Sequence, residues 1–219
     1  LTQLEGMTSI TLSPNTRRDN VIMGNSYEVL WGQGFITDYI GNVKYQISPL
    51  SFYQVNPVQT EILYQTAMDY AGLTGKETVV DAYCGIGTIG MIASKQVKEV
   101  IGVEIVEDAV AAARENAKLN GLDNCKFIAG DVLKVLDDLT EKPDVIVLDP
   151  PRDGIHPKAL PKILSYGVNR IVYVSCKATS LARDLEAFLQ AGYRLEKACC
   201  VDQFCETVWT EAVALLVKE

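Results

Sequence analysis

The spacing of hydrophobic and polar positions changes at about residue 57. Before it, short extended runs rich in Tyr, Val and Ile are separated by Gly and Asn, which is typical of β-strands joined by turns. These runs predict strands at 27–32, 34–41 and 42–48. We therefore expect a small β-rich segment at residues 1–56 and a separate, larger domain at 57–219.

The second part alternates runs that are apolar throughout with amphipathic helices. Helices are predicted at 58–73, 89–97, 107–121, 157–166 and 179–192, and strands at 78–83, 99–105, 125–131, 144–151 and 170–176. Strands of this kind between helices indicate a parallel sheet that is covered on both faces. The predicted fold class is α/β, a Rossmann-like, mostly parallel sheet. A final extended run at 206–218 fits a hairpin at its edge.

Composition excludes several classes of protein. The 219 residues are 48% hydrophobic, enough for a sizeable core, and no run of about 18 apolar residues could form a membrane span. The N-terminus lacks the basic-then-apolar order of a signal peptide. The six cysteines form no CxxC pair, so we predict no metal site. We expect a cytoplasmic monomer with no membrane partner.

A glycine-rich loop follows the first strand of the larger domain. Gly85, Gly87 and Gly90 fit GxGxxG, and Glu104 ends the next strand, where it could accept hydrogen bonds from a ribose. This pattern alone fits a dinucleotide or an adenosyl cofactor.

Acidic residues around that loop favour S-adenosylmethionine. Asp81 would repel a pyrophosphate, but it could hold a methionine ammonium and suits a sulfonium. Asp131 ends the third strand, where it could accept from an adenine amino group, although it could also simply cap a helix.

Candidate reactive groups follow later strands. The fourth strand ends in Asp149-Pro-Pro-Arg152, a stiff lip that could hold a flat base. Cys176 ends the fifth strand, where a thiolate could add to an electrophilic ring carbon, or the residue could be a small buried hydrophobe. Glu211 interrupts the apolar last strand; it is either a tuned general base or a solvent-facing residue of an edge strand.

Six ordered blocks resemble the RNA uracil-5-methyltransferases, from about residue 18 to the C-terminus. They are SFYQVNP (51–57), DAYCGIGT (81–88), GVEIVEDAV (102–110), LDPPRDG (148–154), YVSCKATSLARDL (173–185) and VDQFCETVWTEA (201–212). The resemblance implies that Cys176 attacks C6 of a uridine, that C5 then takes the methyl group, and that Glu211 removes the C5 proton. It also implies methyl-donor contacts at Gln54, Tyr83, Thr88, Glu104, Asp131 and Asp149, with Phe52 beside the donor.

The sequence departs from the family's pattern in two blocks. Lys177-Ala178 stand where Asn-Pro usually follows the SC motif. In the last block Cys205 replaces a proline and Trp209 a histidine. These changes concern the surroundings of Glu211 more than the nucleophile.

The formal net charge of −8 argues against a broad basic surface that would bind nucleic acid. Full-length members of the family usually carry an N-terminal β-barrel that binds RNA, and some carry an iron–sulfur cluster near it. Our hypothesis is that this chain is a catalytic-domain fragment, and that a further segment supplies the basic RNA surface and any such cluster.

The predicted function is therefore methyl transfer from S-adenosylmethionine to C5 of a uridine in RNA, with 23S ribosomal RNA favoured and transfer RNA as the alternative. Cytosine-5 methylation fits less well, because those enzymes place a cysteine after proline where this chain has Arg152. Enzymes that methylate an amino group usually carry DPPY or NPPY, and Arg152 stands here where the aromatic residue of that motif would be, which disfavours this interpretation. A non-catalytic RNA-binding module would need neither Cys176 nor Glu211, and a nicotinamide dehydrogenase rests on the glycines alone.

Overall fold

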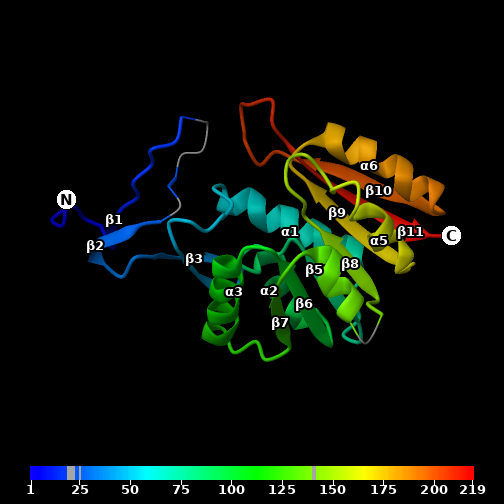
Figure 1. The fold of residues 1–219 in the computed structure, drawn as a ribbon, viewed down its shortest axis with the longest axis horizontal. Coiled ribbons are helices and arrows are strands. Elements are labelled where there is room, and N and C mark those ends of the chain that lie inside the picture. Colours follow the sequence, from blue (N-terminus) through cyan, green and yellow to red (C-terminus); the bar gives the residue numbers. More distant parts are fainter. Residues whose placement is uncertain (19–22, 25, 140–141) are drawn as a thin grey trace.

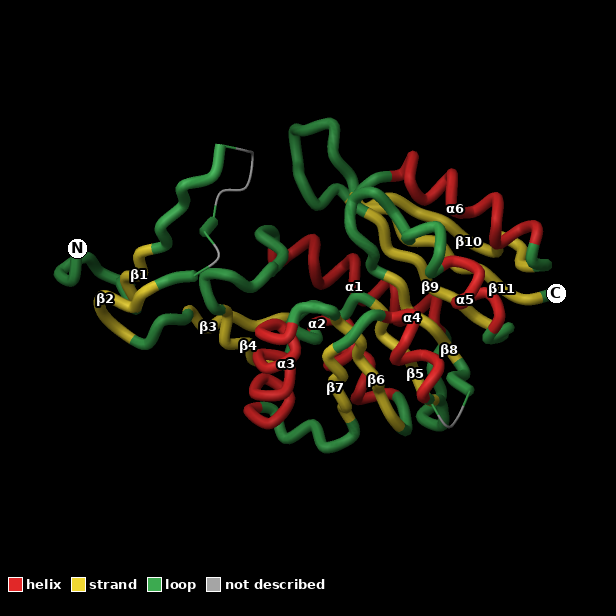
Figure 2. The backbone as a smooth tube through the Cα atoms, in the orientation of Figure 1, coloured by secondary structure: helices red, strands yellow, loops and turns green. Residues whose placement is uncertain are grey.

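A seven-stranded sheet forms the centre of the protein (Figures 1 and 2). The computed structural model describes residues 1–18, 23–24, 26–139 and 142–219. The strand order is β10-β11-β9-β8-β5-β6-β7. The strands are β5 (Thr78–Ala82), β6 (Glu99–Glu104), β7 (Cys125–Ala129), β8 (Val145–Leu148), β9 (Arg170–Ser175), β10 (Tyr193–Val201) and β11 (Glu211–Lys218). Among these seven strands β11 alone runs opposite to the other six, so the predicted mostly parallel sheet is confirmed.

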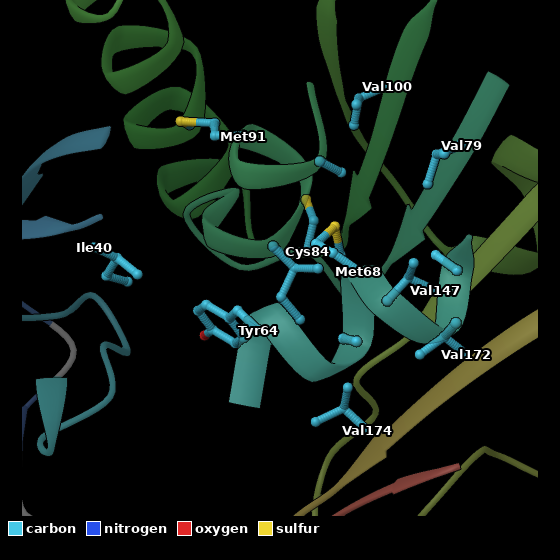
Figure 3. Packing of buried hydrophobic residues seen from close by; sticks show 14 of the residues in the cluster. Ile40, Tyr64, Met68, Val79, Cys84, Met91, Val100, Val147, Val172 and Val174 are labelled. Carbon is cyan, nitrogen blue, oxygen red and sulfur yellow. The ribbon is translucent and has the colours of Figure 1, made fainter. Parts of the chain in front are cut away.

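Helices cover both faces of this sheet, as predicted. They are α1 (Pro57–Ala71), α2 (Thr88–Ala93), α3 (Glu107–Leu119), α4 (Val132–Val135), α5 (Leu160–Ser165) and α6 (Ala178–Gln190), with 3-10 turns η1 (Ser94–Gln96) and η2 (Leu136–Asp138). Successive strand residues point to opposite faces, so Val79 packs in a cluster with α1 to α3, whereas Val80 packs with α4 to α6. Figure 3 shows the first cluster, with Met68 of α1 and Met91 of α2 among its members.

Four short strands precede the sheet: β1 (Ser9–Leu12), β2 (Glu28–Gly32), β3 (Ile36–Ile40) and β4 (Val43–Ile47). They form two antiparallel pairs, β1–β2 and β3–β4. The second pair packs on α3, where the Asn120 side chain accepts from the Lys44 N–H (2.9 Å) and donates to its carbonyl (2.7 Å). Every residue of β2 is exposed, and Figure 1 shows β1 and β2 away from the large sheet.

The structure adds elements that the hydrophobic pattern did not predict, namely β1, β10 and α4. β10 was missed because it is an edge strand with most residues exposed, so its sequence lacks a continuous apolar run. The final extended run is shorter than expected, because residues 202–210 form a loop and the strand begins at Glu211. No helix within the described ranges has the length and apolar character needed to cross a membrane.

Candidate active site

The glycine-rich loop connects β5 to α2. Tyr83 has a φ of +68°, which is strained for a side chain with a Cβ, and Gly87 has a φ of +81°. A Cβ at Gly87 would lie 2.7 Å from the Phe127 ring, so only glycine fits there. Glu104 fixes this loop, because its Oε2 accepts from the Gly85 N–H at 3.1 Å. Its Oε1 accepts from the Val106 N–H at 3.0 Å, which leaves free lone pairs on both oxygens.

Asp81 lies fully buried beneath the loop. Its Oδ2 accepts from the Gly90 N–H at 2.8 Å, while Oδ1 has no hydrogen-bond partner among the described residues. Burial raises the pKa of Asp81 to about 7, and the charge of Glu104 acts in the same direction. An unsatisfied buried carboxylate oxygen is costly without a partner, so it fits a site that receives a cationic or hydrogen-bond-donating ligand.

Thr88 and Asp131 begin the helices that follow their strands. The Thr88 hydroxyl lies 3.2 Å from the Tyr64 hydroxyl of α1, which ties α2 to α1. The Asp131 carbonyl accepts from the backbone of α4. Burial raises the pKa of Tyr83 to about 12, with the charge of Asp131 as the next cause, so these two side chains share one environment.

Gln54 and Phe52 lie in the segment before α1. Gln54 is buried, in keeping with a residue that lines an internal site. Phe52 is 74% exposed, and its place beside a methyl donor stays a prediction.

Cys176 and Glu211 lie near the same end of the β9–β11 ladder. Its last pair is Ser175 with Ala212, Cys176 directly follows Ser175, Glu211 directly precedes Ala212, and the charge of Glu211 acts on the Cys176 thiol. Glu211 is only 2% exposed and β11 is an interior strand, which excludes the solvent-facing edge position considered above. Burial raises the pKa of Glu211, as a general base requires.

Three charges act on the Cys176 thiol. Its pKa is raised by burial and then by the negative charges of Glu211 and Asp149, while the positive charge of Arg152 opposes the rise. Burial also raises the pKa of Asp149, followed by the charges of Glu211 and Asp81. Asp149 therefore links the glycine-loop carboxylate to the cysteine and glutamate.

The lip after β8 is fastened to α6. Asp184 is buried, and its Oδ2 accepts from the Ile155 N–H (2.8 Å) and the Tyr173 hydroxyl (2.7 Å). The Ser180 hydroxyl donates to the Arg152 carbonyl at 2.9 Å. The sequence motifs did not predict this role of Asp184. A signal was present, because an aspartate stands on the apolar stripe of α6, three residues after Leu181.

The loop at 202–210 is fastened to the start of α1. Gln203 is buried, and its Nε2 donates to the Thr60 hydroxyl (3.0 Å) and the Asn56 carbonyl (3.3 Å). Asn56 caps α1 and donates to the Gln203 carbonyl at 3.3 Å. Nearer its end, this loop places the Trp209 ring under Arg152, with the guanidinium carbon 3.8 Å from the ring centroid.

The structure thus forms two adjoining groups from the predicted residues. Asp81, Tyr83, Thr88, Glu104 and Asp131 surround the glycine loop, and Asp149, Cys176 and Glu211 form the second group. In the part of the chain that the structure describes, no three His, Cys, Asp or Glu side chains gather as ligands for a metal ion.

The fold defines a Rossmann-like methyltransferase, with a glycine loop and acidic residues at the carboxyl ends of its strands. The sequence profile of the tRNA (uracil-5-)-methyltransferases matches residues 40–219. The chain belongs to this family, which confirms the resemblance drawn from its motifs.

Individual relatives agree with this membership. The chain is 46% identical over 216 residues to an uncharacterised RNA methyltransferase of Clostridium tetani, covering 97% of this chain and 47% of that protein. It is 48% identical over 211 residues to one of Halalkalibacterium halodurans, covering 95% and 46%. The crystal structure of the tRNA (uracil-54, C5)-methyltransferase of Pyrococcus abyssi with S-adenosyl-L-homocysteine is 32% identical, with a TM-score of 0.81, and the match covers 95% of this chain and 50% of that one. The chain spans about half the length of these relatives.

Proposed function

We propose that this chain forms the catalytic part of an RNA (uracil-5-)-methyltransferase, which transfers a methyl group from S-adenosylmethionine to C5 of a uridine. The observation that carries the proposal is that Cys176 and the buried Glu211 adjoin the last pair of the β9–β11 ladder, where the charges of Glu211 and Asp149 both act on the Cys176 thiol. The family membership supports it. So does the similar Pyrococcus abyssi protein, which is a uracil C5-methyltransferase in complex with S-adenosyl-L-homocysteine, the demethylated donor.

The glycine loop and the strand ends fit the methyl donor. Asp81 offers an unsatisfied buried oxygen, and Glu104 retains free lone pairs beside the loop. S-adenosylmethionine, when bound, would supply an electrophilic methyl group on a cationic sulfur; C5 of the uracil would take this methyl group as its bond to sulfur breaks, which leaves S-adenosylhomocysteine. The residues proposed to hold it are Gln54, Tyr83, Thr88, Glu104, Asp131 and Asp149.

Cys176 is proposed as the nucleophile. Its thiolate would form a bond to C6 of the uracil, and the electron pair of the C5–C6 double bond would move onto C5 and the adjoining carbonyl. Covalent addition is needed because C5 of uracil is otherwise too weak a nucleophile to take a methyl group. Arg152 favours the thiolate over the thiol, against the effect of burial.

Glu211 is proposed as the base of the final step. It would take the proton from the methylated C5, and that electron pair would restore the double bond as the bond between Sγ and C6 breaks. A buried carboxylate with a raised pKa is suited to this role. Because C6 and C5 of the uracil ring must both be accessible beside Cys176, the base would first be extruded from its stack in the RNA.

The RNA proposed as substrate is bacterial 23S ribosomal RNA, with transfer RNA as the alternative. Both would carry the same chemistry at the uracil ring, and the difference would lie in contacts outside it. We further propose that the protein acts in the cytoplasm as a monomer, and that its catalytic domain begins at residue 57.

Trapping with 5-fluorouridine tests the mechanism. The full-length protein is incubated with the methyl donor and 5-fluorouridine-substituted 23S or transfer RNA, and run on a denaturing gel. Because fluorine on C5 cannot leave as a proton, we expect a protein–RNA adduct that Cys176→Ala abolishes and that Cys200→Ala, a change at an exposed cysteine, retains. With ordinary RNA, Glu211→Gln should accumulate the same adduct. Donor binding without an adduct on either RNA would refute the proposed function.

A further inference from the structure

Trp209 holds an unusual position beside the proposed reactive centre. Its side chain is 46% exposed, although large aromatic rings are usually covered in folded proteins. The guanidinium of Arg152 covers one face, with 3.8 Å between its carbon and the ring centroid. The charge of Arg152 also acts on the Cys176 thiol, so the stacked pair lies at the edge of the reactive centre.

The loop that carries Trp209 is ordered by its own hydrogen bonds. The backbone N–H of Trp209 donates to the Thr207 hydroxyl at 3.1 Å, and that hydroxyl donates to the Phe204 carbonyl at 2.6 Å. At its start, Gln203 is bonded to Asn56 and Thr60. The indole is therefore presented from a built loop, and binding to it would cost little ordering entropy.

The backbone of Arg152, on the other side of this contact, is fixed by its neighbours. Its carbonyl accepts from Ser180 of α6, and Pro151 before it restricts the backbone. The charge of Arg152 acts on the Cys176 thiol, but the Trp209 ring takes no part in the proposed attack by Cys176 or in proton removal by Glu211. A partly exposed aromatic ring that is backed by a guanidinium at the edge of such a centre is suited to stacking on a base, which every nucleobase can do.

We propose that Trp209, held in place by Arg152, stacks on a nucleobase that neighbours the target uridine. Extrusion of the uridine removes a stacking partner from each neighbouring base, and the indole replaces one of them. Trp209 is then a binding residue for RNA, and Arg152 positions it. This inference rests on the proposed function, since it requires an extruded uridine at Cys176.

The test uses the full-length protein and eleven-nucleotide single-stranded RNAs with a central 5-fluorouridine between adenosines, or with one neighbour replaced by an abasic residue. Removing a stacking aromatic weakens binding by about ten-fold, so we expect this loss for Trp209→Ala. Trp209→Phe keeps a ring and should bind within about twofold of the wild type. Binding of the RNA should quench the fluorescence of Trp209 in the wild type. In Trp209→Phe this part of the quenching should be absent.

A thermodynamic cycle separates stacking from a change in loop structure. An abasic neighbour should weaken binding to the wild type and leave binding to Trp209→Ala unchanged, because the contact is already lost. Additive losses would overturn the proposal, as would equal affinities of Trp209→Ala and the wild type. Trp31→Phe is the matched control, because Trp31 is also exposed (40%) but lies in β2, and this change should alter neither affinity nor adduct yield.

Arg152→Lys tests the positioning role. It keeps the positive charge near Cys176 but loses the flat guanidinium, so RNA affinity should fall while the pH profile of Cys176 alkylation stays in place. The outcomes also distinguish the two proposals. An adduct that forms equally well, with equal affinity, in Trp209→Ala overturns the stacking alone. Failure of the wild type to bind the eleven-nucleotide RNAs overturns the stacking proposal, and failure to form an adduct with 5-fluorouridine-substituted 23S or transfer RNA overturns both.

Discussion

Replacing Asp184 by alanine should both destabilise the protein and loosen the lip. The substitution leaves two buried donors, the Ile155 N–H and the Tyr173 hydroxyl, without their acceptor. Each such loss costs about 1–3 kcal/mol, so we expect a fall of about 2–6 kcal/mol in the free energy of unfolding. The partner Arg183 is exposed and adds nothing to this figure. Asp184→Asn retains one carbonyl oxygen toward both donors and should lose about 1 kcal/mol.

Urea unfolding measures the stability of each variant. The rate at which the 5-fluorouridine adduct forms shows whether the lip still supports the reaction. Glu186→Ala is the control on α6, because this side chain is exposed and its loss should change the stability by no more than about 0.5 kcal/mol. We expect Asp184→Ala to slow adduct formation while the affinity for S-adenosylhomocysteine changes little, because the glycine loop lies on other strands. A stability of Asp184→Ala within about 0.5 kcal/mol of the wild type would refute the reasoning.

Two further predictions concern charge and backbone shape. Arg152→Met removes the charge that favours the Cys176 thiolate, so the pKa of the thiol should rise and the alkylation of this cysteine, followed by peptide mass spectrometry, should move to higher pH. An unchanged or lower midpoint would contradict this. Gly85→Ala and Gly87→Ala both place a Cβ at positive φ, which costs about 1–2 kcal/mol, but only the second also meets the Phe127 ring. Gly87→Ala should therefore lose more stability in urea and more affinity for S-adenosylhomocysteine, and equal losses would show that the ring yields.

The large sheet could be predicted because its interior strands are apolar throughout. Strands buried on both faces need no alternation, and the helices between them carry clear amphipathic patterns. β10 lacks this signal, since only its ends are buried. Strand order also lies outside the pattern. Nothing in the local sequence states that β11 inserts between β9 and β10, and this insertion is what buries Glu211.

The candidate site was predictable as a set of residues and not as an arrangement. Asp81 and Glu104 could be found because they end strands next to a glycine loop. The nearness of Cys176 and Glu211 depends on a register between distant strands, which no local periodicity encodes. The stacking of Arg152 on Trp209 is likewise a long-range contact. The division of the chain at residue 57 stays a prediction.

The arrangement of charges answers the objection that an acidic chain should avoid RNA. The formal charge of −8 counts Asp81, Asp149 and Glu211 as ionised, yet burial raises the pKa of all three. Asp81 and Glu211 are buried, and all three groups lie inside the proposed site, so they add little to the surface that an RNA would meet. Arg152 is exposed on the lip of this site, and Lys177 follows the end of the neighbouring strand β9. Buried carboxyl groups would favour a cationic donor within, and cations at the rim would favour a polyanion outside, so the proposed site would suit both ligands of the proposed reaction.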